Sequence, residues 1–375
     1  MHNRVAGRLA AVGIAALAMG IAATPAHAEK IANSYICVFK NDRVAKDDVP
    51  GRANAAAKAQ GGAVKHIYRN TIRGFSANMS EQAVTAMRRA NPSIAYCEQD
   101  QVVTLGPIRA EARPGGGGTQ PAQTTPWGIM RVGGFADGTG KRAWIIDSGI
   151  DGSHPDLNVD TARSKDFTGS RSGWKDESGH GTHVAGTVAA KNNSVGVVGV
   201  AAGASVVAVR VLDRRGSGSY SGVIAGVEYV ASNAGAGDVA NMSLGGPVSQ
   251  ALDDAVIAAG AKLAMVLAAG NESDNAANHS PARAGGVSKT DRVYAVSAST
   301  QTNALASFSN YGLGVEWAEP GVGIPSTYKD GGYASLSGTS MAAPHLAGIL
   351  LLGAPEIGGT ISGDRDSSPD PIGVR

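Results

Sequence analysis

The chain has 375 residues, and 33 lysines and arginines against 31 aspartates and glutamates give a formal net charge of +2. A charge this close to zero gives no electrostatic reason to expect nucleic acid or a membrane surface as a partner. The length suffices for one large α/β domain plus a smaller unit, and 52 glycines with only 5% aromatic residues indicate many tight turns around a core of small aliphatic side chains.

The first 28 residues have the pattern of a signal peptide. Arg4 and Arg8 precede an uncharged run over residues 9–23, and Ala26-His27-Ala28 has the small-x-small form of a cleavage site. The run is shorter than the roughly 20 apolar residues that a membrane-spanning helix needs. The sequence therefore predicts a secreted protein, either extracellular or periplasmic.

Residues 29–108 are expected to form a small α+β unit, because strand-like and helical segments alternate there over short distances. Ser80 stands where it can cap the second helix. The expected elements are a strand over 34–40, a helix over 53–62, a strand pair over 64–79, a helix over 80–90 and a strand over 93–103.

The only two cysteines, Cys37 and Cys97, lie in two of these strand-like segments. Secretion permits a disulfide, which would form if the two strands pair. Two free buried thiols are equally compatible with the sequence. Both alternatives remain open, and neither makes a cysteine catalytic.

Residues 112–126 contain four consecutive glycines among Pro, Gln and Thr. This composition predicts a flexible, exposed linker that proteases can reach.

After the linker, continuous apolar segments alternate with helical ones, which predicts a parallel sheet covered on both faces. The strand segments are 143–147, 205–212, 238–244, 263–270 and 293–299. Asp147, Ser243 and Asn271 stand at the ends of such strands. Sites in these sheets form at the carboxyl ends of the strands, so we expect the three residues to lie near one edge.

His180 and His183 begin an Ala- and Val-rich helical segment, with Ser178 as the expected N-cap. A zinc protease helix needs two histidines four residues apart with a Glu as base, whereas these are three apart with no such Glu. The pattern therefore favours no catalytic metal. His183 faces an apolar helix and is expected to be a core residue.

Ser340 precedes a helical run over 341–352. An ordinary N-cap would explain a serine there, but a serine becomes a nucleophile when a histidine and a carboxylate accompany it. Asp147 and His180 supply those groups, and Asn271 can donate to an oxyanion. The chain order Asp, His, Ser excludes an α/β-hydrolase.

Three motifs resemble the catalytic blocks of the subtilisin family of serine proteases, the subtilases. They are Asp147-Ser148-Gly149, His180-Gly181-Thr182-His183 and Gly338-Thr339-Ser340-Met341-Ala342. The resemblance extends over residues 122–352. Residues 29–108 resemble the inhibitory propeptide of the family.

The resemblance implies an α/β fold, with a mainly parallel sheet between helices, preceded by a small α+β ferredoxin-like propeptide. It divides the chain into a signal peptide (1–28), a propeptide with linker (29–121) and a catalytic domain (122–375). The implied function is a secreted, monomeric serine endopeptidase, made as a self-processing precursor that its own propeptide inhibits. Self-processing is expected between residues 112 and 122. The alternative, a catalytically silent binding protein, predicts loss of a triad member, and none is lost.

By the same resemblance, Ser340 is the nucleophile, His180 the general base and Asp147 its orienting group. Asn271 and the Ser340 N–H form the oxyanion hole. Protein and peptide substrates would bind as an extra strand, with broad specificity and a preference for medium or large apolar side chains. The implied substrate-binding residues are Gly216, Ser217, Gly218, Tyr220, Ser243, Leu244, Gly245, Ala268, Ala269 and Gly270.

A structural calcium ion is also implied, through all-oxygen coordination. The implied ligands are the side chains of Gln123, Asp156 and Asn193 and the backbone oxygens of Lys191, Val195 and Val197. Near the C-terminus, Asp364, Asp366 and Asp370 lack a loop glycine and a closing Glu, and we expect a solvated tail there.

Overall fold

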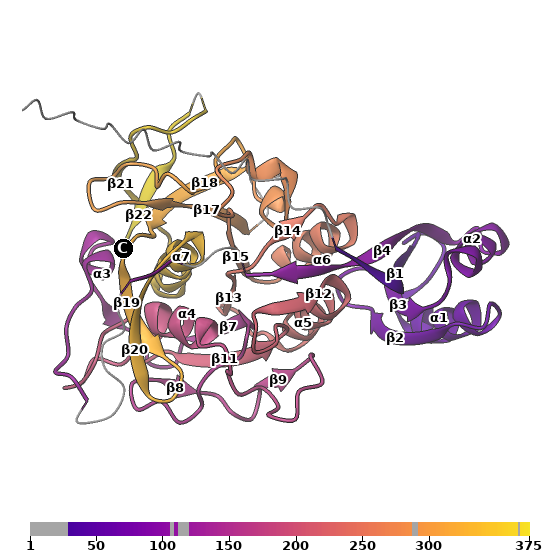
Figure 1. The fold of residues 1–375 in the computed structure, drawn as a ribbon, viewed down its shortest axis with the longest axis horizontal. Coiled ribbons are helices and arrows are strands. Elements are labelled where there is room, and N and C mark those ends of the chain that lie inside the picture. The colour runs from indigo at the N-terminus through magenta and orange to yellow at the C-terminus, as the bar shows by residue number, and fades with distance from the viewer. Residues whose placement is uncertain (1–28, 106–108, 112–119, 287–291, 367) are drawn as a thin grey trace, which may run out of the picture.

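The computed structural model describes residues 29–105, 109–111, 120–286, 292–366 and 368–375. The chain forms two lobes, and Figure 1 shows the smaller, N-terminal lobe in indigo and violet at one end of the larger. The signal peptide predicted for residues 1–28 lies outside the described residues. Within the described ranges, no helix has both the length and the apolar character needed to cross a membrane.

The larger lobe is built on a ten-stranded sheet in the order β21-β22-β18-β17-β15-β13-β7-β11-β8, with β9 also paired to β11. The strands from β18 to β8 run parallel. The bounds are β7 Arg142–Asp147, β8 Asn158–Val159, β9 Lys165–Asp166, β11 Ser205–Arg210, β13 Val239–Met242, β15 Ala264–Ala268, β17 Val293–Ser299, β18 Val315–Pro320, β21 Glu356–Thr360 and β22 Pro371–Val374.

Helices cover both faces of this sheet. Alternate residues of β7 point to opposite sides: Trp144 and Ile146 pack with α5 (Tyr220–Asn233) and α6 (Gln250–Gly260), whereas Ala143 and Ile145 pack with α4 (His180–Ala189) and α7 (Thr339–Leu352). A strand buried on both faces must be apolar at every position. The predicted α/β fold with helices on both faces is thus confirmed.

The smaller lobe is an antiparallel sheet in the order β4-β1-β3-β2 with two helices and a core of its own. Its elements are β1 Lys30–Phe39, α1 Val49–Lys58, β2 Ala63–Tyr68, β3 Gly74–Asn78, α2 Glu81–Ala90 and β4 Ile94–Thr104. The Ser80 hydroxyl accepts a hydrogen bond from the Ala83 N–H, so the predicted cap of α2 is confirmed. Cys37 and Cys97 lie opposite each other on β1 and β4 and form a disulfide, which resolves the two alternatives that the sequence left open.

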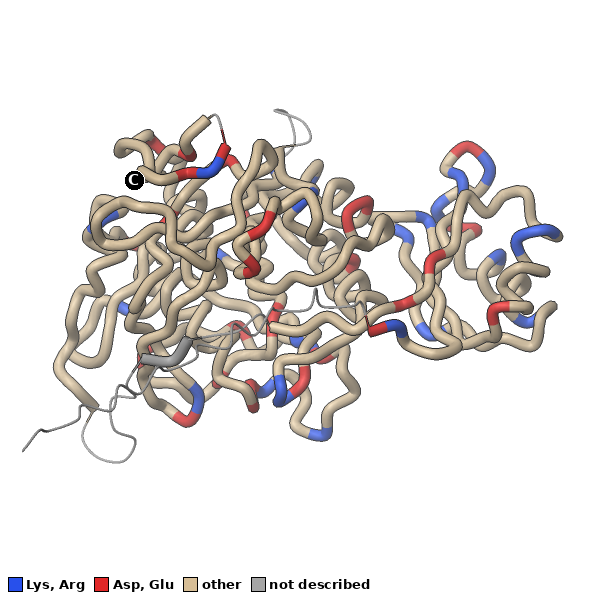
Figure 2. The backbone as a smooth tube through the Cα atoms, turned by 45° about the horizontal axis from the view of Figure 1, so that its top comes forward, with Lys and Arg blue, Asp and Glu red and all other residues tan. Residues whose placement is uncertain are grey.

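Shorter elements complete the larger lobe. They are α3 Trp127–Arg131, β5 Arg109–Glu111, β6 Ala136–Asp137, β10 Ala201–Ala202, β12 Ser217–Ser219, β14 Gly246–Pro247, β16 His279–Ser280, β19 Ile324–Tyr328 and β20 Gly332–Ser337. The described residues also contain three 3-10 turns: η2 (Ala276–Asn278) and η3 (Ala282–Ala284) in the larger lobe, and η1 (Lys46–Asp48) in the smaller lobe. Figure 2 shows Lys and Arg interspersed with Asp and Glu along both lobes.

The C-terminal segment differs from the expected solvated tail. It forms the hairpin β21-β22, which extends the main sheet beside β18. Asp370 is 3% exposed and accepts a hydrogen bond from the Ser297 hydroxyl, and burial together with Asp364 and Asp366 raises its pKa to about 8. The prediction was wrong because polar residues spaced like a loop can still end in a strand.

The linker prediction is also partly corrected. Residues 112–119 lie outside the described residues, but the last part of the predicted linker is fixed. Ala122 and Thr124 form β-bridges to Val195 and Val197, so this segment is held against the neighbouring loop.

Candidate active site

Asp147 and His180 meet at the carboxyl edge of the sheet. Asp147 ends β7 and His180 begins α4, and both are buried. The His180 Nδ1 atom lies 2.8 Å from Asp147 Oδ1 and 2.9 Å from Oδ2, so Nδ1–H donates to the carboxylate. The other ring nitrogen, Nε2, is buried without a hydrogen-bond partner among the described residues. The pair thus presents an acceptor nitrogen, as a general base requires.

A second buried carboxylate, Asp176, fixes the start of α4. It accepts hydrogen bonds from the N–H groups of Ser178 and Gly179 and from the Ser148 hydroxyl on one oxygen, and from Thr182 on the other. The N-cap is Gly179 with φ +102°, not Ser178 as predicted. Burial raises the pKa of Asp176. The sequence signal was an Asp four residues before the helix, which the prediction overlooked.

Ser340 is the second residue of α7 and lies beside the end of β13. Its hydroxyl donates to the Ser243 carbonyl oxygen at 3.1 Å, and the Ser243 hydroxyl donates to the Ser340 carbonyl at 2.9 Å. Among the described residues, no hydrogen bond joins Ser340 Oγ to His180. The first turn of α7 leaves its N–H groups at the serine, where they favour negative charge.

Asn271 follows β15 and is oriented by Thr339. The Asn271 Oδ1 atom accepts hydrogen bonds from the Thr339 N–H at 2.9 Å and from the Thr339 hydroxyl at 3.0 Å. Because the oxygen is held in this way, the NH₂ end of the amide remains as the donor. That arrangement suits the stabilisation of an oxyanion.

A small cavity of about 20 Å³ lies next to Ser340. Five residues predicted to bind substrate line it: Leu244, Gly245, Ala268, Ala269 and Gly270. Asn271 and Ser340 also border this cavity, together with Thr339 of the third motif. Four further lining residues were not predicted from the sequence: Gly246, Glu272, His279 and Ala282.

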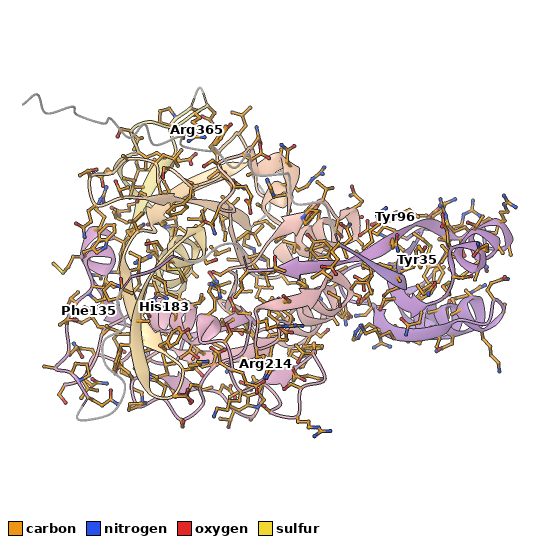
Figure 3. The ribbon with its side chains drawn as sticks, in the orientation of Figure 1. Tyr35, Tyr96, Phe135, His183, Arg214 and Arg365 are labelled. Carbon is orange, nitrogen blue, oxygen red and sulfur yellow. A yellow bond between two sulfur atoms is a disulfide. The ribbon has the colours of Figure 1, made fainter. Side chains whose placement is uncertain are left out.

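His183 lies one turn below the site and is fully buried. Its Nε2–H donates to the carbonyl oxygens of Ile324 and Ala334, at 3.0 and 3.1 Å. Burial and the neighbouring His180 lower its pKa to about 3, so the ring stays neutral. Figure 3 labels His183 in the interior of the larger lobe. These contacts agree with a structural role.

The last strand of the smaller lobe lies along the predicted substrate cleft. On one side, β4 pairs antiparallel with β12: Val103 is opposite Gly218 and Thr104 is opposite Ser217. The Leu105 N–H also donates to the Gly216 carbonyl at 2.8 Å. On the other side, Thr104 forms a bridge to Gly245. The two edges predicted to hold a substrate strand therefore hold this strand.

Tyr220 borders the same strand. The ring packs in one cluster with Val103, and its hydroxyl donates to the Pro247 carbonyl at 2.5 Å. The segment that follows β4 is also paired with the larger lobe. Its strand β5 runs antiparallel to β20, the strand that leads into Gly338 and α7.

Carboxylates join the two lobes at helix ends and turns. Glu98 accepts from the N–H of Gln250 and from the Ser249 hydroxyl at the start of α6. Asp100 accepts from the N–H and the hydroxyl of Ser221 at the start of α5. Neither residue was predicted from the sequence, because nothing local distinguishes them from solvated acids.

Glu228 of α5, on the larger lobe, accepts hydrogen bonds from a turn of the smaller lobe. Its carboxylate accepts from the backbone N–H groups of Arg69, Asn70 and Thr71, between β2 and β3. Three consecutive N–H groups on one carboxylate make a strong, charge-assisted contact between the lobes.

The residues predicted to hold calcium lie together. Asp156 accepts from the Asn193 amide at 2.8 Å and from the Val197 N–H at 3.1 Å. Gln123 Oε1 accepts from the Asn193 N–H, and Lys191 Nζ of the same loop donates to the Pro155 carbonyl oxygen. Burial raises the pKa of Asp156. The atoms predicted to coordinate the ion are oxygens, which calcium prefers as ligands.

Two parts of the chain match known protein families. Residues 143–354 match the subtilase family, and residues 24–106 match the peptidase inhibitor I9 family. The chain belongs to the subtilase family. It is a serine protease with an I9 inhibitor propeptide domain, as the three motifs and residues 29–108 predicted.

Individual members of the family are also similar to this chain in sequence and in fold. The chain is 39% identical to alkaline serine exoprotease A of Vibrio alginolyticus over 86% of its own length and 60% of that protein. It is 38% identical to subtilisin NAT of Bacillus subtilis subsp. natto over 85% of its own length and 79% of that protein. A crystal structure of a cold-adapted subtilisin-like serine proteinase matches with a TM-score of 0.53 at 39% identity, covering 60% of this chain and 83% of that one.

Proposed function

We propose that this subtilase is a serine endopeptidase with Ser340 as nucleophile, His180 as general base and Asp147 as its orienting group. The observation that carries the proposal is the buried hydrogen bond between His180 Nδ1 and Asp147. It holds the neutral ring in the tautomer that leaves Nε2 able to accept a proton. In this proposal Ser340, at the start of α7 and within the residues that match the subtilase family, gives this proton.

Catalysis begins when the Ser340 hydroxyl turns from the Ser243 carbonyl to His180. As Oγ attacks the peptide carbonyl carbon, its proton passes to His180 Nε2. The proton then goes to the leaving amine nitrogen, and an acyl-enzyme on Ser340 remains. Water, deprotonated by the same nitrogen, attacks the ester and frees the enzyme.

The negative charge that develops on the carbonyl oxygen is stabilised by the Asn271 NH₂ group and the Ser340 N–H. Thr339 supports this role, because its two hydrogen bonds to Asn271 Oδ1 orient the amide in advance.

Substrates bind as an extended strand between Gly216–Gly218 and Ser243–Gly245. The pairing of β4 with β12 supports this, since the cleft accepts a backbone through main-chain hydrogen bonds. The walls formed by Ala268 and Ala269 are apolar. We therefore propose broad specificity with a preference for apolar side chains.

Residues 29–121 act as propeptide and intramolecular inhibitor, and residues 122–375 as catalytic domain. The lodging of β4 in the cleft supports inhibition, because a strand tethered there competes with substrate at high effective concentration. We propose that the enzyme removes this segment itself. Residues 1–28 direct export, and the mature enzyme acts outside the cell as a monomer on protein and peptide substrates.

A calcium ion has a structural role in this proposal, held by the side chains of Gln123, Asp156 and Asn193 and the backbone oxygens of Lys191, Val195 and Val197. The buried Asp156 carboxylate supports this assignment, since a cation there would offset the cost of burying its charge. When bound, the ion supplies cross-linking of loops and takes no part in the chemistry.

The test uses self-processed enzyme and a peptide p-nitroanilide with Leu before the anilide. We expect turnover that a serine-directed phosphonate abolishes, with the phosphonate found on Ser340 by peptide mass. Labelling of another residue would contradict the triad assignment. Absence of both turnover and labelling would support a catalytically silent binding protein.

A further inference from the structure

We propose that Asp176 is a positioning residue for the Asp147–His180 pair and supplies a second negative charge that favours the protonated form of His180 during turnover. The residue touches neither substrate nor Ser340 in this account, and it acts through both partners of the pair. The inference rests on the proposed function, because it deepens the role of His180 as general base.

On the helix side, Asp176 holds the backbone around His180. Its Oδ1 atom accepts hydrogen bonds from the Ser178 N–H at 2.9 Å and from the Gly179 N–H at 2.8 Å. Its Oδ2 atom accepts from the Thr182 N–H at 2.9 Å and from the Thr182 hydroxyl at 2.6 Å. His180 lies between these anchored residues, so the carboxylate fixes the first turn of α4, which carries the imidazole.

On the strand side, Asp176 reaches the residue that follows Asp147. The Ser148 hydroxyl donates to Asp176 Oδ1 at 2.9 Å and accepts from the Gly181 N–H at 3.0 Å. The Ser148 N–H donates to Asp147 Oδ1 at 2.6 Å, and the same oxygen atom accepts from His180 Nδ1 at 2.8 Å. One carboxylate therefore holds both the strand end and the helix start that the Asp147–His180 hydrogen bond joins.

The hydrogen-bond partners of Asp176 require an ionised carboxylate. All five are donors: three backbone N–H groups, and the hydroxyls of Ser148 and Thr182. Each of these hydroxyl oxygens already accepts a hydrogen bond from another N–H, and its proton points to the carboxylate. Burial raises the pKa of Asp176, and the hydrogen bonds to its charged form oppose this rise. A protonated carboxyl would find no acceptor among these five partners.

The charge of Asp176 bears on the proton that His180 gains. Asp147 and Asp176 are both buried, and among the described residues no Lys, Arg or His forms an ion pair with Asp176. His183, one turn further along α4, stays neutral because burial and the neighbouring His180 lower its pKa to about 3. The remaining charged groups near the start of α4, two positive and two negative, form a neighbouring network: Asp166, Glu177, Arg210 and Lys329. Two buried carboxylates thus favour the imidazolium that forms when Ser340 gives up its proton.

The test uses Asp176→Asn, in which a side chain of the same shape loses the charge and one of its two acceptor ends. Both kcat and KM are measured with the Leu p-nitroanilide as a function of pH, and titration with the phosphonate counts the matured active sites. We expect kcat on the pH plateau to fall about tenfold or more, the range of a hydrogen bond to a charged group, with little change in KM. The acid limb of kcat/KM should move to lower pH by about half a unit or more, because a nearby negative charge favours the imidazolium.

Two further variants separate position from charge. Asp176→Glu keeps the charge but lengthens the side chain, so kcat should fall while the acid limb stays at its wild-type pH. Ser148→Ala removes only the hydroxyl between Asp176 and the strand end, so kcat should fall by a smaller factor, again without a shift of the acid limb.

Glu356→Gln is the matched control, since it removes an exposed carboxylate on the edge strand β21, and both kcat and the acid limb should stay at their wild-type values. A wild-type kcat in Asp176→Asn overturns the positioning role, and an acid limb that does not move overturns the role of the charge. If Asp176→Asn does not fold, a wild-type kcat in Ser148→Ala overturns the inference. Failure of the proposed function is distinguishable, because the wild-type enzyme would then show neither turnover of the Leu p-nitroanilide nor labelling of Ser340.

Discussion

The two lobes solve the same problem of burial in different ways. The catalytic lobe has a sheet covered on both faces, with α4 buried along its whole length. The propeptide lobe covers one face of its sheet with two helices whose outer sides are exposed, and the other face packs against α5 and α6 of the catalytic lobe. A unit of this size buries only about 60% of the surface of its unfolded chain, so its stability is marginal. The difference suits a protease that must outlast its inhibitor.

Three carboxylates contribute hydrogen bonds to the contact between the lobes. Glu98, Asp100 and Glu228 accept hydrogen bonds at helix ends and turns, and each acid is solvated again once the lobes part. The interface combines these charge-assisted hydrogen bonds with apolar packing, because Ile36, Val38, Tyr68, Ile72 and Val103 of the propeptide lobe are buried in one cluster with residues of α5 and α6.

The largest effect is expected when the lobes cannot be separated. Ser340→Ala should remain a full precursor from about Glu29, because the proposed nucleophile is lost. Intact-mass measurement would reveal the attached residues 29–121. Ser172→Ala, which removes an exposed hydroxyl, is the control and should mature normally.

Efficient processing of Ser340→Ala in a host without other extracellular proteases would refute self-processing. For the wild-type chain, the masses of the fragments locate the first cut. Because β4 and β5 are held on opposite sides of Ser340, we expect the first cut between Thr104 and Arg109, followed by trimming between residues 112 and 122.

The second largest effect is expected from a substitution in the catalytic lobe. Asn271→Ala should lower kcat by about 10²–10³-fold, a magnitude carried over from the oxyanion donor of subtilisin itself. KM should change little, because the contact forms with charge that develops in the transition state. Steady-state kinetics measure both constants, with Asn233→Ala on α5 as control. A change restricted to KM would count against the oxyanion role.

Residues were predictable from the sequence where a local pattern marks them, and this holds in both lobes. The parallel strands were predicted because each is a continuous apolar run, and Asp147, His180, Asn271 and Ser340 became candidates because each follows such a run or lies in a compact motif. Asp176, Glu98 and Glu228 were missed because their partners come from distant segments, and only the fold brings those together. The C-terminal hairpin was missed for a related reason: the burial of Asp370 depends on β18, not on its own neighbours.

Removing the disulfide should weaken the propeptide lobe alone. The double variant Cys37→Ser, Cys97→Ser opens a bond between residues 60 apart, worth about 4 kcal/mol in the chain-entropy account. We expect a shorter lag before activity is released, since an unfolded inhibitor leaves the cleft. Progress curves of maturing precursor measure the lag.

The mature enzyme from that variant is its own control. Both cysteines precede residue 122, so its thermal stability should equal that of the wild-type enzyme. An unchanged lag would mean that the disulfide contributes nothing to inhibition.

Calcium should stabilise only the catalytic lobe. The proposed ligands join the segment at Gln123 to loops at Asp156 and Asn193, and free calcium at 100 times its Kd would add about 2.7 kcal/mol. Chelation should therefore speed thermal inactivation without lowering initial turnover. Equal inactivation rates in calcium and in chelator would contradict the site, and Asp156→Asn should remove the calcium effect.

The smallest expected effect lies at the junction of the lobes, where Figure 3 labels Tyr96. Its hydroxyl donates to Asp254 Oδ2 at 2.5 Å, from β4 to α6. Tyr96→Phe keeps the ring and removes this hydrogen bond, which is worth about 1 kcal/mol, so the cleaved propeptide should bind about fivefold more weakly. Tyr35→Phe removes a hydroxyl from β1 of the same lobe, and inhibition by that variant should be unchanged. Both inhibition constants are measured against mature enzyme, with the peptide p-nitroanilide that has Leu before the anilide as substrate. Equal weakening by the two variants would show that propeptide stability, and not this contact, sets the affinity between the lobes.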